Sequence, residues 1–118
     1  MLKGRATIII ILHNRHRNLD RLLDYYAGVE FPIVIADSSK QKHKFEHLSD
    51  SVKYIYRPGS SFTQKVEEIL PAINTPYVLM CADDDFVVPS GIRACTEFLD
   101  KNSEYSSAQG MILKYYVN

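Results

Sequence analysis

Residues 7–12 read TIIIIL, a continuous apolar run dominated by β-branched side chains. The run lacks the alternation of polar and apolar residues that a strand with one exposed face shows. Both faces of such a strand are expected to be buried, as in a parallel sheet covered by helices on each side. This segment therefore predicts an α/β fold.

Strands and helices are expected to alternate along the rest of the chain. Further strands are predicted at 33–36, 52–56, 77–82 and 107–117, and residues 40–51 form a polar loop. Helices are predicted from Asn18 to Gly28, from Ser61 to Pro71, and from Ser90 over Ile92, Cys95, Phe98 and Leu99. The order predicts one Rossmann-like domain over residues 1–118, a mostly parallel sheet with helices on both faces.

Local signals place the ends of these helices. Ser61 and Gln64 have the spacing of a capping box, in which each side chain satisfies a backbone N–H of the other residue. Pro71 should kink or end the helix that begins at Ser61. Gly28 is typical of a helix C-terminus, and Ser90 of an N-cap.

The charge balance bears on the expected partners. Lys plus Arg and Asp plus Glu number 14 each, for a formal net charge of +0. A nucleic-acid-binding protein usually has a basic excess, so we expect no nucleic-acid partner. The two cysteines, Cys81 and Cys95, are interpreted as buried reduced thiols.

The apolar run at residues 6–12 follows two basic residues, as the core of a signal peptide does. It is short for that role, and His13 and Arg15 follow where a small-residue cleavage site would stand. It is also too short to span a bilayer. We therefore interpret it as a strand and expect a cytoplasmic protein.

Polar residues follow three of the predicted strands where those strands end. They are His13, Asn14 and Arg15, then Asp37, Ser38 and Ser39, and finally the acidic block Asp83, Asp84 and Asp85. Carboxyl ends of parallel strands meet at one edge of a sheet, where α/β proteins bind ligands. Mg²⁺ or Mn²⁺ carrying a diphosphate is the expected counter-charge for such carboxylates. The alternative is a solvated acidic turn preceding a helix.

Three segments in this order, TIIIILHNR, VIADSS and PYVLMCADDDFVVP, resemble family 2 glycosyltransferases, which have the GT-A fold. The resemblance covers nearly the whole chain, as the N-terminal nucleotide-binding half of that domain. It implies a nucleoside-diphosphate sugar as donor, most often a UDP- or GDP-sugar, and a divalent Mn²⁺ or Mg²⁺ cofactor. The acceptor stays unknown.

The resemblance also implies roles for individual residues. His13, Asn14 and Arg15 would border the nucleotide, Asp37 and Ser38 would lie at the base or ribose, and Asp83 would face the ribose. Asp84 would be the best metal ligand, with Asp85 assisting. Ala82 stands where many members carry the first aspartate, so Asp83 and Asp85 are an alternative Asp-x-Asp pair. Arg15 or Arg57 would add a cation near the phosphates.

Several alternatives stay open. In the resembling family the general base lies downstream of this segment, so the catalytic base is unknown and transfer by this chain alone is undecided. A second class is a non-catalytic metal- or phosphate-binding module of receiver type, but the loop after the first strand, HNRHRN, is basic. A sugar nucleotidyltransferase would need glycine there. A homodimer through Tyr115, Tyr116 and Val117 is expected if the last strand leaves an open edge.

Overall fold

The computed structural model describes residues 4–113. Its strands are β1 (Ala6–Leu12), β2 (Ile33–Asp37), β3 (Val52–Tyr56) and β4 (Tyr77–Ala82). They form one parallel sheet in the order β3-β2-β1-β4. The predicted α/β fold is confirmed, and the sheet is Rossmann-like in its order.

The chain divides into two compact units, Met1–Val87 and Val88–Asn118. The first contains the sheet, the helices α1 (Leu19–Tyr25) and α2 (Phe62–Ile69), and the 3-10 turns His16–Asn18 and Leu70–Ala72. The second contains α3 (Pro89–Lys101). All the residues of the candidate site belong to the first unit.

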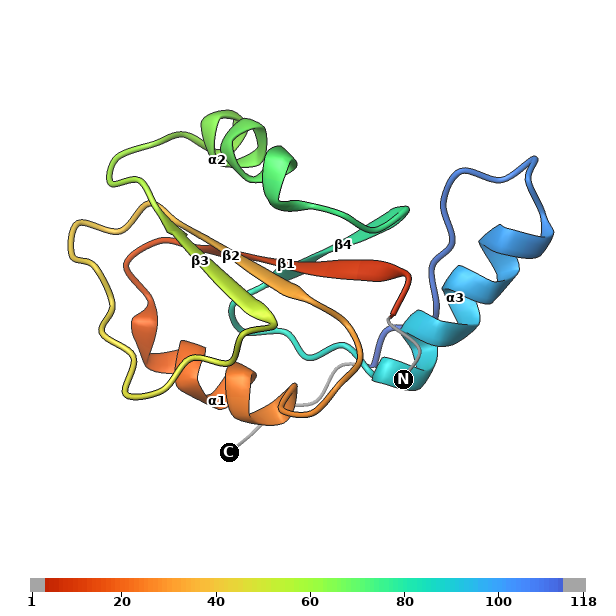
Figure 1. The fold of residues 1–118 in the computed structure, drawn as a ribbon, viewed down its shortest axis with the longest axis horizontal. Coiled ribbons are helices and arrows are strands. Elements are labelled where there is room, and N and C mark those ends of the chain that lie inside the picture. The colour runs from red at the N-terminus through yellow and green to blue at the C-terminus, as the bar shows by residue number, and fades with distance from the viewer. Residues whose placement is uncertain (1–3, 114–118) are drawn as a thin grey trace. The chain divides into compact units, whose positions relative to one another are not determined.

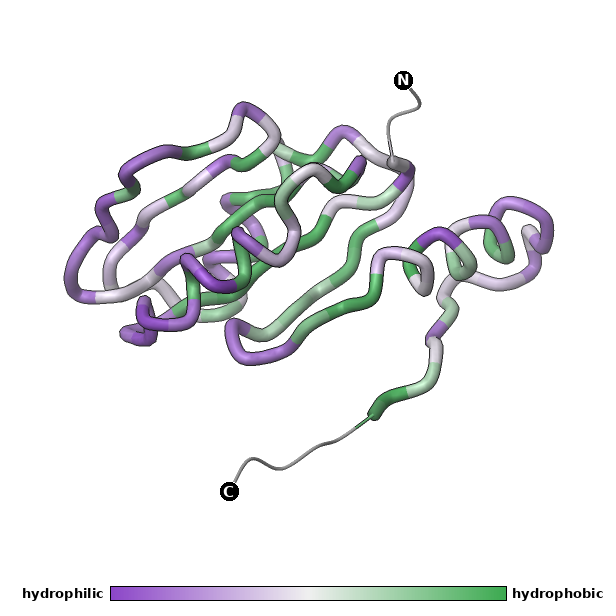
Figure 2. The backbone as a smooth tube through the Cα atoms, turned by 90° about the horizontal axis from the view of Figure 1, so that it is seen from below, coloured by the Kyte–Doolittle hydropathy of each residue, from purple (hydrophilic) through white to green (hydrophobic). Residues whose placement is uncertain are grey.

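The two helices of the first unit cover opposite faces of the sheet (Figure 1). On the α2 face, Ile69 packs in a core cluster with Ile9, Val34 and Ala36. On the α1 face, Leu19, Leu22 and Tyr26 are buried. Burying one large aliphatic side chain contributes about 1.5–3 kcal/mol. Figure 2 shows the apolar residues concentrated along the strands and the polar ones in the loops, as the TIIIIL run predicts.

Several predicted boundaries are confirmed closely. β3 and β4 begin and end where the sequence places them, and β1 and β2 are each one residue longer. The capping box forms, because Ser61 Oγ accepts from Gln64 N at 3.2 Å and Gln64 Oε1 accepts from Ser61 N at 2.8 Å. α2 gives way to a 3-10 turn that contains Pro71.

Two predictions are wrong. α3 begins at Pro89 with Val88 as its N-cap, one residue before Ser90, because proline has a helical φ and lacks the N–H that the first turn leaves unpaired. Residues 107–113 form no strand, and the rest of that prediction, with Tyr115 to Val117, lies outside the described residues. Gly110 weakens strand formation, and Ile112 is 69% exposed, so no burial holds the segment straight.

No helix among residues 4–113 is both long enough and apolar enough to cross a membrane.

Candidate functional site

The strand order reverses between β1 and β4. The chain passes from β1 to β2 and β3 on one side, and then returns to place β4 on the other side of β1. Ile11 pairs with Ala82, so the loops that follow β1 and β4 leave the sheet side by side. In open α/β sheets, the crevice at such a reversal is where ligands bind.

The acidic block forms a turn at this position. Asp85 N donates to Ala82 O at 3.2 Å, which closes the turn. The side chain of Asp83 is 8% exposed, while that of Asp84 is 53% exposed. Cys81 and Asp83 are both buried because the two-residue alternation of β4 continues past the end of the strand. Asp85 is exposed.

Asp83 carries a buried oxygen without a hydrogen bond. Among the described residues, Asp83 Oδ2 is the buried side-chain oxygen or nitrogen that has no hydrogen-bond partner. Arg15 Nε lies 3.2 Å from it, within ion-pair distance but without the alignment of a hydrogen bond. Arg15 Nη2 lies 3.4 Å from Asp84 Oδ2. One guanidinium group thus serves two carboxylates, and it satisfies neither completely.

Asn14 directs Arg15 toward the acidic turn. Asn14 has φ 55°, a left-handed conformation that asparagine tolerates better than most residues. Its backbone N–H donates to Ser39 Oγ at 2.7 Å, and its Oδ1 accepts from Lys40 N at 3.0 Å. His13 Nδ1 lies 2.9 Å from Ser38 Oγ. These contacts bind the loop after β1 to the loop after β2, so the backbone that carries Arg15 is fixed.

Asp37, at the end of β2, is fully buried and fully hydrogen-bonded. Oδ1 accepts from Ser39 N at 2.9 Å and from Ser39 Oγ. Oδ2 accepts from Tyr54 OH and lies 3.0 Å from His16 Nε2. Burial raises the pKa of Asp37, but the hydrogen bonds from Ser39, Tyr54 and His16 outweigh it, so the net pKa lies below the ordinary 3.8. All four acceptor positions of the carboxylate are filled.

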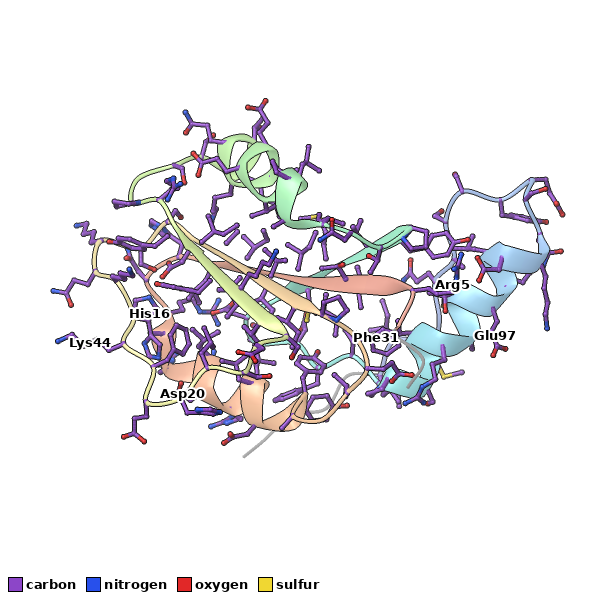
Figure 3. The ribbon with its side chains drawn as sticks, in the orientation of Figure 1. Arg5, His16, Asp20, Phe31, Lys44 and Glu97 are labelled. Atoms are coloured by element: carbon purple, nitrogen blue, oxygen red, sulfur yellow. The ribbon has the colours of Figure 1, made fainter. Side chains whose placement is uncertain are left out.

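An aromatic row extends from Asp37 into the loop at residues 40–51. The rings of His16 and His43 lie 5.0 Å apart, and those of His43 and Phe45 lie 4.6 Å apart. His43 Nε2 also lies 3.2 Å from Asp20 Oδ1. Figure 3 shows His16, Asp20 and the loop residue Lys44 at the same end of this unit. The row holds an otherwise irregular loop against the sheet edge.

Lys65 is a buried cation that approaches the end of β1 from the α2 side. It is 6% exposed, and its Nζ donates to Leu12 O at 3.3 Å. Burial lowers the pKa of Lys65, an effect that the charge of Asp37 partly opposes. Lys65 thus reaches the end of β1 from α2, whereas Arg15, in the loop that follows β1, extends to the acidic turn.

Two tyrosines at the C-terminal end of α1, the last helical residue Tyr25 and the C-cap Tyr26, hold the segment that follows the acidic turn. Tyr26 OH accepts from Val87 N at 2.9 Å, and Tyr25 OH donates to Val87 O at 3.2 Å. The rings of Tyr25 and Phe86 lie 5.0 Å apart. Burial raises the pKa of Tyr26, so its hydroxyl stays protonated. This clamp fixes the backbone downstream of Asp85.

An apolar pocket lies beside the acidic turn. Its lining residues are Ile11, Phe62, Met80, Cys81 and Ala82. Ala82 directly precedes Asp83, and Phe62 is the first residue of α2. The pocket offers apolar surface next to the carboxylates but no charged group of its own.

The structure brings together most of the residues that the sequence singles out. His13 lies against Ser38, Asn14 against Ser39, and Arg15 against Asp83 and Asp84. Arg57 is directed elsewhere, with its Nε 3.0 Å from Glu68 Oε2.

Sequence reasoning did not select Lys65, His16 or Tyr54. Lys65 carries a readable signal, because it stands on the apolar stripe of α2 three residues after Phe62 and four before Ile69. His16 and Tyr54 carry none, since their contact with Asp37 depends on strand order and loop path.

The described part of the chain holds no closed metal site built from protein ligands alone. Residues 4–113 contain no group of three or more His, Cys, Asp or Glu side chains that could hold a metal ion. Asp83 and Asp84 are a pair, which is the number of protein carboxylates that Mg²⁺ commonly takes before water and phosphate complete its shell. The pair, with an oxygen of Asp83 that accepts no hydrogen bond, is compatible with a divalent ion that arrives with a phosphate ligand.

Compared with family models and with curated protein sequences, the chain matches none at a significant level.

Proposed function

We propose that this chain is the nucleotide-sugar-binding part of a glycosyltransferase of the GT-A type, and that it binds a UDP- or GDP-sugar together with Mn²⁺ or Mg²⁺. The observation that carries the proposal is the buried oxygen of Asp83 that lacks a hydrogen bond. It lies where the strand order reverses, beside Asp84 and 3.2 Å from Arg15 Nε. A buried polar atom left unpaired costs about 1–3 kcal/mol, which a bound ligand would recover.

Asp83 and Asp84 are the residues that would hold the metal ion. The ion, when bound, would offset the negative charge that develops on the departing nucleoside diphosphate. We assign Asp83 a larger part in metal binding than the sequence analysis did, because its buried oxygen accepts no hydrogen bond. Asp84 is half exposed and is held by a single long contact with Arg15 Nη2, so its side chain is able to turn toward an incoming ligand. Asp85 is exposed and carries the weakest support of the three.

The chain supplies cationic groups for the diphosphate. Arg15 lies at the mouth of the site with 47% of its side chain exposed, so its guanidinium group is able to reach a ligand. Arginine matches two phosphate oxygens at once through parallel hydrogen bonds. Lys65 is buried behind the end of β1 and adds positive potential there.

The nucleoside would lie on the side of β1 that faces β2. The exposed side chains of His13 and Asn14 form a polar rim there, and the buried Ser38 holds His13 through a hydrogen bond. Asp37 lies beneath this rim with all four acceptor positions occupied, so we assign it the positioning of the loops rather than a direct contact.

The proposal assigns no acceptor and no catalytic base. A sugar transfer with inversion needs a carboxylate or similar group to take the acceptor's proton. The acidic residues of α3 and of the turn after it belong to the second unit and are given no role here. The cytoplasmic location likewise stays a prediction.

The strand order weighs against the receiver-like alternative. Receiver-type domains have the order 2-1-3-4-5, in which β1 lies between β2 and β3. Here β1 lies between β2 and β4. The order is instead that of the Rossmann type, whose members bind nucleotides at the same reversal.

A thermal-shift panel tests the proposal. UDP, GDP, CDP and ADP are each added with and without Mn²⁺ to the wild-type chain, to Asp84→Asn, and to Asp50→Asn as a matched exposed control. A ligand at 100 times its dissociation constant stabilises the fold by about 2.7 kcal/mol. We expect a Mn²⁺-dependent shift with UDP or GDP, present in Asp50→Asn and lost in Asp84→Asn. No shift with any nucleotide would show the proposal to be wrong.

A further inference from the structure

Arg15 already occupies the two carboxylates that the proposed function assigns to a metal ion. Its Nε and Nη2 lie 3.2 Å from Asp83 Oδ2 and 3.4 Å from Asp84 Oδ2. We propose that Arg15 competes with the divalent cation for these carboxylates in the free protein, and moves to the diphosphate when a nucleotide binds. This inference rests on the proposed function and deepens it, because it states how the site is regulated.

The charge on Asp83 requires a partner in the free protein. Its side chain is nine-tenths buried, and an isolated buried carboxylate is costly. Arg15 supplies the counter-charge, and the ion pair connects the loop after β1 with the acidic turn. A metal ion must therefore displace the guanidinium group before both carboxylates become available.

The contacts of Arg15 with the two carboxylates are weak enough for a ligand to displace its guanidinium group. The Arg15 Nε to Asp83 Oδ2 contact lacks hydrogen-bond alignment, and the Arg15 to Asp84 contact is long at 3.4 Å. Arg15 is also half exposed, so water screens its attraction to the carboxylates. Its backbone is fixed by Asn14, whose amide and side chain bond to the loop after β2. Only the arginine side chain needs to move.

A diphosphate gives the displaced guanidinium group a better place. A guanidinium group binds phosphate oxygens through two parallel hydrogen bonds. In the free protein, the guanidinium group of Arg15 makes no hydrogen bond to Asp83 Oδ2. Metal without nucleotide leaves the arginine without an anionic partner. Metal and nucleotide together give every charge a partner, so each should strengthen the binding of the other.

The expected change in Mn²⁺ affinity depends on the fraction of molecules in which Arg15 leaves Asp83 and Asp84 uncovered. If the guanidinium group covers the carboxylates about 90% of the time, the apparent metal affinity falls about tenfold. Removing its charge should therefore tighten Mn²⁺ binding in the absence of nucleotide. The same change should weaken nucleotide binding at saturating Mn²⁺, because the diphosphate loses a cation. Opposite signs for the two ligands distinguish competition from a general loss of structure.

The test compares Arg15→Gln with Arg17→Gln, which removes the same charge from an exposed position of the same loop. Mn²⁺ affinity is measured without nucleotide by electron paramagnetic resonance of the free ion. UDP and GDP affinities are measured by thermal shift at saturating Mn²⁺. Arg15→Lys, which keeps the charge but loses the planar fork, is the second variant, and unliganded melting temperatures show that each variant is folded.

We expect Arg15→Gln to bind Mn²⁺ about tenfold more tightly than wild type and the nucleotide about tenfold more weakly. Arg17→Gln should match wild type in both assays, and Arg15→Lys should fall between. If wild type binds Mn²⁺ and Arg15→Gln binds it equally or more weakly, the competition is wrong while the proposed function stands. If no variant binds Mn²⁺ or nucleotide, the proposed function fails and this inference fails with it.

Discussion

Two buried carboxylates lie at the same edge of the sheet and differ in how completely they are hydrogen-bonded. Asp37, after β2, accepts from Ser39, Tyr54 and His16, and no position on it is free. Asp83, after β4, has an oxygen with no hydrogen bond and an imperfect ion pair with Arg15. Both are at most 5% exposed, so burial does not separate them.

We interpret this difference as one between a structural carboxylate and the carboxylate to which the proposed function assigns a ligand. A buried polar group that is fully satisfied contributes to a unique fold, because each of its partners is fixed in place. A buried polar group left unsatisfied is retained at a cost to stability, and such costs are concentrated at functional sites. On this account Asp37 holds the loops at the β2 end in place, whereas Asp83 would bind the metal ion of the proposed function.

The largest expected effect tests the structural half of this comparison. Asp37→Asn removes one charged acceptor that serves several buried donors, and the new amide NH₂ faces groups that also donate. We expect a loss of about 3–5 kcal/mol in the free energy of unfolding, measured by urea denaturation. A loss below about 1 kcal/mol would mean that the network around Asp37 does not hold these loops together.

The pH dependence of stability gives an independent check on Asp37. Its pKa in the folded chain lies below the ordinary 3.8, so the charged carboxylate stabilises the fold above that value. This contribution should be lost as the pH falls below about 4 toward the folded pKa. Denaturation at stepped pH should show a steeper acid loss for wild type than for Asp37→Asn. Equal slopes would contradict the assignment.

A medium effect is expected on the β4 side, at the tyrosine clamp. Tyr26→Phe removes the acceptor of Val87 N–H at a partly buried position, which costs about 1–3 kcal/mol. Tyr25→Phe is the control, because Tyr25 is 41% exposed and its hydroxyl bond is open to water. We expect the control to lose less than about 1 kcal/mol. Equal losses would show that the clamp does not depend on the buried hydroxyl.

The smallest effect on stability sharpens the comparison most. Asp83→Asn makes the same chemical change as Asp37→Asn at the same edge, but it removes a charge that lacks a hydrogen bond. We expect a change within about 1 kcal/mol of wild type in urea denaturation, because no buried donor loses its acceptor. Mn²⁺ binding should nevertheless be abolished. A loss as large as that of Asp37→Asn would remove the distinction between the two sides.

Much of the fold could be predicted from local patterns. The uninterrupted TIIIIL run required burial on both faces, and the Ser61 and Gln64 spacing located the start of α2. The predicted strand at 107–117 failed because a strand depends on a paired neighbour, which no local pattern supplies. Ser90 failed as an N-cap because Pro89 competes for the same turn, and proline is well suited to the first helical position.

The site could be predicted only in part, for a related reason. The strand ends were brought together as the parallel sheet requires, so Arg15 and Asp83 meet as neighbours. The family resemblance ranks Asp84 above Asp83 as a metal ligand. The burial of Asp83 depends instead on how far the in-and-out alternation of β4 continues past the end of the strand. The satisfaction of Asp37 by Tyr54 depends on β3 lying beside β2, and the sequence does not state that order.

The most direct test of the account is an anomalous difference map at the manganese edge, from crystals grown with Mn²⁺ and UDP or GDP. The account predicts one manganese peak bonded to carboxylate oxygens of Asp83 and Asp84, with the Arg15 guanidinium group moved onto the diphosphate. A map with nucleotide and manganese elsewhere, or with Arg15 still covering Asp83, would contradict it.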